Sequence, residues 1–89
     1  MVVVVVKMSA AVDRSVDEER RYLTEAAIIR VMKTSRQLAH HDLVARVMLQ
    51  LASRFRADSR TIKQCVDDLI NRDYMRRAEH SSSTYVYVA

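Results

Sequence analysis

The chain has 89 residues, of which 49% are hydrophobic and 29% charged, and its formal net charge is +4. This length forms one small domain, and the composition excludes a disordered or membrane-embedded chain. Its single cysteine, Cys65, excludes an internal disulfide and suits a reducing compartment, so we expect a protein of the cytoplasm and nucleus. The opening MVVVVVK is far shorter than the roughly 20 residues of a membrane span.

The N-terminal half is predicted to contain a tail and a helix. Residues 1–13 are interpreted as a flexible tail and residues 14–89 as one domain. The helix is predicted from about Val16 to Ser35, because it would carry acidic side chains at its start and basic ones at its end. The 3.6-residue period places its apolar residues on one side and Lys33 nearly opposite. We therefore expect Lys33 to project into solvent.

Two further helices are predicted. After an extended piece around residues 37–39, apolar residues at helical spacing from Leu43 to Phe55 indicate a second helix, with Asp42 as its N-cap. The segment ADSR opens a third helix, capped by Asp58 or Ser59, whose apolar stripe includes Cys65. Cys65 is therefore predicted to be a core residue rather than a nucleophile.

The C-terminus is predicted to form a β-hairpin. Residues 74–79 and 84–88 flank HSSS, and the alternation in TYVYV is typical of a half-buried strand. Tyr85 and Tyr87 are expected to share one face and to pack on the helices. Three helices followed by a hairpin predict a mostly helical α+β fold, the winged helix-turn-helix.

A winged helix suggests DNA binding, but the charges support it only in part. The outward face of the third helix would carry Arg60 and Lys63 beside Asp67 and Asp68, and those carboxylates would face phosphates. An enzyme is less favoured, because the histidines match no metal-binding motif and no glycine loop is present to hold a phosphate. Neither a metal nor a cofactor is expected.

Several segments resemble the winged-helix neddylation domain that ends the cullin proteins. The resemblance covers about residues 16–89, and its most specific pieces are IIRVMK, LINRDYM and the terminal YVYVA. A cullin is many times longer, so we expect this chain to be a piece of one. The resemblance implies that Lys33 accepts a ubiquitin-like modifier through an isopeptide bond, and that the domain is a substrate rather than a catalyst.

The resemblance also implies partners. These are a RING-box protein, the modifier and its conjugating enzyme, a cullin exchange factor and the deconjugating signalosome, with neither a membrane nor nucleic acid among them. Modification would activate a ubiquitin ligase that the parent cullin scaffolds. The outer face of the first helix is partly apolar, and the residues expected to face partners there are Tyr22, Ala26, Ile29, Arg30 and Arg36. A protein-docking module that is not modified at Lys33 is an alternative interpretation.

Overall fold

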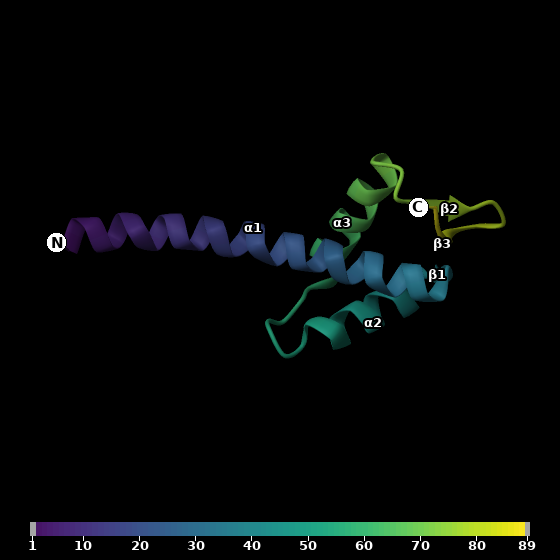
Figure 1. Ribbon diagram of the computed structural model, residues 1–89, viewed down its shortest axis with the longest axis horizontal. Coiled ribbons are helices and arrows are strands. Elements are labelled where there is room, and N and C mark those ends of the chain that lie inside the picture. Colours follow the sequence, from purple (N-terminus) through teal and green to yellow (C-terminus); the bar gives the residue numbers. More distant parts are fainter. Residues whose placement is uncertain (1, 89) are drawn as a thin grey trace.

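The computed structural model describes the backbone of residues 2–88 and the side chains of residues 18–88. The chain forms three helices and a three-stranded antiparallel sheet, whose first strand lies between the first and second helices (Figure 1). The predicted mostly helical α+β winged-helix fold is confirmed. The elements are α1 (Val2–Ser35), β1 (Gln37–Ala39), α2 (His40–Leu51), α3 (Ser59–Asn71), β2 (Met75–Ala78) and β3 (Ser81–Tyr87).

Helix α1 begins earlier than predicted. It starts at Val2 instead of about Val16, and its N-terminal half projects away from the other elements (Figure 1). The chain contains no glycine and no proline, so no residue between these two positions breaks a helix. The division into a flexible tail of residues 1–13 and a domain of residues 14–89 stays a prediction, and Met1 and Ala89 lie outside the described residues.

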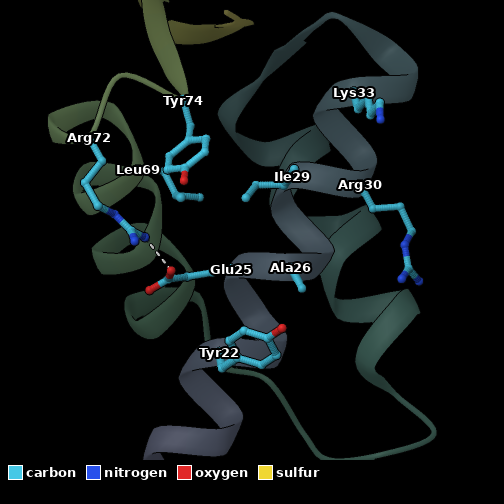
Figure 2. Close-up of a pocket in the computed structure, with 9 residues that line it drawn as sticks. All are labelled: Tyr22, Glu25, Ala26, Ile29, Arg30, Lys33, Leu69, Arg72 and Tyr74. Atoms are coloured by element: carbon cyan, nitrogen blue, oxygen red, sulfur yellow. Dashed lines mark hydrogen bonds and ion pairs between the residues drawn. The ribbon is translucent and has the colours of Figure 1, made fainter. Parts of the chain in front are cut away.

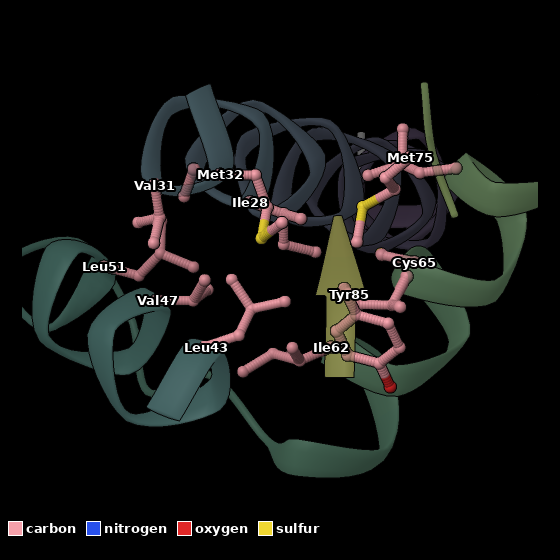
Figure 3. Packing of buried hydrophobic residues seen from close by; sticks show 13 residues of the cluster. Ile28, Val31, Met32, Leu43, Val47, Leu51, Ile62, Cys65, Met75 and Tyr85 are labelled. Atoms are coloured by element: carbon pink, nitrogen blue, oxygen red, sulfur yellow. The ribbon is translucent and has the colours of Figure 1, made fainter. Parts of the chain in front are cut away.

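The core lies where the C-terminal half of α1 meets α2, α3 and the sheet. Helix α1 supplies four buried apolar residues at helical spacing, and α2 and α3 face them with their own apolar stripes (Figure 3). Cys65 lies in this core, as predicted, and is fully buried. Among residues 18–88, the core members are Ala27, Ile28, Val31, Met32, Leu43, Val47, Leu51, Ile62, Cys65, Val66, Leu69, Met75 and Tyr85.

The starts of α2 and α3 differ in how they are capped. Helix α2 begins at His40 directly after β1, with Ala39 at the N-cap position, so the prediction that Asp42 caps this helix is wrong. Pairing of β1 with β3 holds Ala39 in an extended conformation, so the helix already starts at His40 and Asp42 lies inside its first turn. The prediction that Asp58 caps α3 is confirmed, because its carboxylate accepts hydrogen bonds from the backbone N–H groups of Arg60 and Thr61.

The sheet joins the segment after α1 to the C-terminal hairpin. Its strand order is β1-β3-β2, and both pairings are antiparallel. The predicted extended piece is therefore a third strand, in which Leu38 lies opposite Tyr85. Tyr85 is 1% exposed and its hydroxyl lies 2.8 Å from His40 Nδ1, which confirms that it packs on the helices. Strand β3 begins at Ser81, so most of the predicted HSSS turn is strand.

Among the described residues, no helix combines the length and the apolar character that crossing a membrane requires.

Candidate functional site

A groove of about 560 Å³ runs between the outer face of α1 and the end of α3 (Figure 2). One wall comes from α1 and the other from the last residues of α3 and the segment that leads into β2. The groove has an apolar floor and charged rims. Its lining residues are Tyr22, Glu25, Ala26, Ile29, Arg30, Lys33, Leu69, Arg72 and Tyr74.

The α1 wall follows from the spacing of the sequence. Tyr22, Ala26, Ile29 and Lys33 recur at intervals of four, three and four residues, which places them on one face of a helix. The opposite face of the same turns is buried in the core, so this face is turned outward. Tyr22 is 70% exposed, and Figure 2 shows Ile29 pointing toward α3.

The second wall depends on how α3 ends. Asp73 has a positive φ of 66°, and the chain then turns so that the N–H of Tyr74 donates to the carbonyl of Leu69 at 3.0 Å. This left-handed residue closes the helix in a Schellman-type arrangement. The N–H of Val88 donates to the carbonyl of Tyr74, which ties the same segment to the end of the sheet. Tyr74 is thus held across the groove from Ile29.

An ion-pair network links the two walls. Arg72 donates a hydrogen bond from Nη2 to Glu25 Oε1 and also pairs with Asp68 Oδ2 at 3.2 Å. Arg21 pairs with the other oxygen of Glu25 at 3.7 Å. The hydrogen bond to Glu25 raises the pKa of Arg72, and the guanidinium lies 5.5 Å from the centroid of the Tyr74 ring. The carboxylates beside the groove are therefore neutralised within the fold.

Lys33 lies at the rim of the groove near the C-terminal end of α1. Its side chain is exposed, as the helical period predicts, and it forms no salt bridge among residues 18–88. The helix ends two residues later at Ser35, and the next residue, Arg36, has a φ of 70° and donates its N–H to the carbonyl of Met32 at 2.6 Å. The amine of Lys33 is therefore accessible while its backbone is held by the packed half of α1.

The comparison with family models decides the family. The model of the cullin protein neddylation domain matches residues 19–81, which include both walls of the groove. The chain belongs to the cullin neddylation-domain family. The predicted resemblance is thereby confirmed.

Curated cullins share this domain at similar levels of identity. The chain is 43% identical over 74 residues to putative cullin-like protein 1 from Arabidopsis thaliana, 40% identical over 79 residues to cullin-1 from Dictyostelium discoideum, and 42% identical over 76 residues to cullin-3 from Caenorhabditis elegans. These alignments cover 83%, 89% and 85% of this chain, respectively. The chain spans only about 10% of the length of each relative.

A solved structure supports the same assignment. It is named "A Dual E3 Mechanism for Rub1 Ligation to Cdc53: Dcn1(P)-Cdc53(WHB)", and the cullin domain superposes on it with a TM-score of 0.83 at 32% sequence identity. The superposition covers 91% of this chain and 93% of the other. The fold is thus shared over nearly the full length of both chains.

The structure brings together most of the predicted site residues of the cullin domain. Tyr22, Ala26, Ile29 and Arg30 line the groove beside Lys33, and Figure 2 shows Arg30 pointing away from α3. Arg36 does not line this groove; its guanidinium lies 5.8 Å from the centroid of the Tyr87 ring. The backbone at Arg36 is left-handed and no longer helical, so the helical spacing of α1 does not predict the direction of its side chain.

Sequence reasoning missed four lining residues. Glu25 lies three residues after Tyr22 and four before Ile29, so the helical spacing would have found it. Leu69, Arg72 and Tyr74 come from the other wall, and no local pattern connects them with α1. Only the packing of α3 against α1 places them at the groove.

Cys65 and Arg77 of the cullin domain have structural roles. Burial raises the pKa of the Cys65 thiol, which disfavours the reactive thiolate. Arg77 bonds Asp67 Oδ1 at 3.1 Å and the carbonyl of Ser82 at 2.8 Å, which ties the hairpin to α3. No group of three or more potential metal ligands occurs among the described residues. The outer face of α3 carries Asp67 and Asp68 beside Arg60 and Lys63, so it lacks the clustered positive charge of a DNA-binding helix.

Proposed function

We propose that this domain accepts a ubiquitin-like modifier on Lys33 and thereby regulates a RING-type ubiquitin ligase that its parent cullin scaffolds. The observation that carries the proposal is the position of Lys33, an exposed primary amine on a rigid helix at the rim of a groove, inside the region matched by the neddylation-domain family. The name of the solved relative speaks of Rub1 ligation to Cdc53, which supports the same role here.

In this reaction the domain is the acceptor of the modifier. The neutral amine of Lys33 attacks the carbonyl carbon of the thioester that joins the C-terminus of the modifier to the conjugating enzyme. The new C–N bond forms an isopeptide, the C–S bond breaks, the enzyme's cysteine leaves as a thiolate, and the amine proton passes to solvent or to a base of the enzyme. Arginine would supply the same positive charge, but it lacks a primary amine.

The groove supports this role by giving a partner a fixed point of contact. Apolar floor residues, the exposed Tyr22 and the cations Arg30 and Lys33 lie together, so an enzyme bound there would hold its thioester near the amine. Positioning of this kind is the main way to accelerate an acyl transfer between two proteins. The domain itself then contributes orientation and a nucleophile, and catalysis belongs to its partners.

The proposed partners follow from this role. They are the RING-box protein, the modifier with its conjugating enzyme, a cullin exchange factor, and the signalosome that removes the modifier. Dcn1 appears in the name of the solved relative together with Cdc53, which supports a ligation factor as one partner. We propose the cytoplasm and nucleus as the location, because a chain with a single cysteine suits a reducing compartment.

The chain has three lysines, Lys7, Lys33 and Lys63, and the test compares Lys33 with Lys63. The protein is incubated with the modifier, its activating and conjugating enzymes and a RING-box protein, and the products are separated by mass. Lys33→Arg should abolish the modified band, whereas Lys63→Arg, which changes another exposed lysine, should leave it unchanged. Mass spectrometry should find the isopeptide remnant on Lys33. Equal modification of the Lys33→Arg variant would show that the site is wrong.

A further inference from the structure

A second surface of this domain gathers positive charge around Phe55. The loop between α2 and α3 folds back against α1, and three adjoining depressions share Phe55 as a lining residue. Arg20 and Arg21 come to these depressions from α1, and Arg54 and Arg56 come from the loop. All four arginines are exposed, and we call them the basic cluster.

The loop arginines of the basic cluster keep their charge available. Among residues 18–88, neither Arg54 nor Arg56 forms a salt bridge. The guanidinium of Arg20 lies 5.4 Å from the centroid of the Phe55 ring, which holds it in place beside them. The nearby carboxylate of Asp58 is occupied by the N-terminus of α3. Within residues 18–88, two exposed cations that form no salt bridge therefore flank a half-buried aromatic residue.

The basic cluster lies away from Lys33, although its member Arg21 also pairs with Glu25 of the groove. Arg20 precedes Lys33 by 13 positions on the same helix, which corresponds to about 20 Å along the axis and a rotation of about 220°. The two side chains thus leave α1 on nearly opposite faces. A ligand on the basic cluster would leave the amine of Lys33 accessible.

We propose that the basic cluster is a docking site for an acidic segment of a partner protein. Carboxylates of the segment would pair with Arg54 and Arg56, whose planar guanidinium groups bind them in a bidentate manner. An apolar side chain of the same segment would pack in the depression between Met48 and Phe55. The site would tether a partner to the domain during modification of Lys33 or afterwards.

The surroundings favour a peptide over a nucleic acid. Arg20 lies over the ring of Phe55, so this face of the ring is not open for stacking with a base. Glu19 and Asp58 also line the depressions and would repel the regularly spaced phosphates of a nucleic acid. A peptide can place its carboxylates only where the arginines lie.

The experiment measures binding of a fluorescein-labelled peptide of alternating glutamate and aspartate with one central leucine, by fluorescence anisotropy at low and at physiological salt. The test variant is Arg54→Glu with Arg56→Glu. The matched control is Lys63→Glu with Arg76→Glu, at two exposed positions on α3 and β2. Each substitution removes two units of charge, so both variants fall from the formal net charge of +4 to zero. Circular dichroism checks that each variant is folded.

We expect the test variant to weaken peptide binding by about tenfold or more and the control to weaken it less than about twofold. The variant Arg54→Gln with Arg56→Gln, which avoids new repulsion, should also weaken it, and Lys33→Arg should not. Equal losses in the test and control variants would show attraction to net charge only and would overturn the proposal. So would the absence of peptide binding, or a duplex DNA that binds more tightly than the peptide. The measurement needs no modifying enzyme, so its outcome is independent of the role of Lys33.

Discussion

Arg72, just past the end of α3, donates a hydrogen bond to Glu25 in the middle of α1, and this contact joins residues 47 positions apart. The side chain of Glu25 is only 18% exposed, so its charge depends on a partner from within the fold. Asp68 and Arg21 extend the pair into a network. The two walls of the groove beside Lys33 are therefore joined by charge as well as by apolar packing.

Breaking this contact should loosen the groove. Arg72→Ala leaves Glu25 without its main partner, so we expect the melting temperature to fall by a few degrees and the modification of Lys33 to slow severalfold. The conservative variant Arg72→Lys, which keeps a positive charge beside Glu25 and Asp68, should lose less of both. Calorimetry and a timed modification reaction measure the two effects. If Arg72→Ala changes neither, the network does not shape the groove.

The cap of α3 should make stability depend on pH. Hydrogen bonds from Arg60 and Thr61 lower the pKa of Asp58 below its usual value of 3.8. A carboxyl whose folded pKa is lowered adds stability above the unfolded pKa and loses this contribution as the pH falls through the folded pKa. Asp58→Asn keeps an oxygen acceptor but not the charge. We therefore expect the wild-type melting temperature to exceed that of the variant at pH 7, and the difference to shrink below about pH 3.8.

The melting temperatures of both proteins, followed by circular dichroism from pH 7 to pH 3, measure this difference. A difference that stays constant over the whole range would contradict the assignment of Asp58 as an ionised cap.

Two leucines on α2 provide a test of the core. Leu43 is fully buried among residues of α1 and α3, whereas Leu49 on the same helix is 77% exposed. Leu43→Ala should lower the free energy of unfolding by about 2 to 5 kcal/mol, because it removes buried methyl groups and leaves a cavity. Leu49→Ala should change it by less than about 0.5 kcal/mol. Urea denaturation followed by circular dichroism measures both free energies of unfolding. Similar losses in the two variants would show that Leu43 has been assigned to the core wrongly.

The buried cysteine should report on unfolding. Cys65 is inaccessible and burial raises the pKa of its thiol, so both access and the thiolate form are disfavoured in the folded protein. A thiol reagent such as dithionitrobenzoate should react at least about a hundredfold more slowly with the native protein than with protein unfolded in guanidinium chloride. Rapid reaction under native conditions would show that α3 opens easily or that the thiol is not buried.

Much of the architecture was predictable because helical signals are local. The apolar period placed the cores of α1, α2 and α3, and Asp58 preceded its helix as a recognisable cap. The beginning of α1 was not predictable, because residues 2–16 contain no glycine or proline to break a helix and the acidic residues after them suggested a start. Strand β1 was too short to be recognised as part of a sheet before its pairing with β3 was known.

The sequence by itself determined that Lys33 faces outward, since a residue opposite the apolar stripe of an amphipathic helix is turned away from the core. It also determined the family, through the order of short motifs along the chain. Only the tertiary structure decided what lies beside Lys33, because Leu69, Arg72 and Tyr74 reach the groove through the packing of α3 on α1. Arg54 and Arg56 likewise come close to Arg20 only because the loop between α2 and α3 folds back against α1. No local sequence pattern predicts that contact.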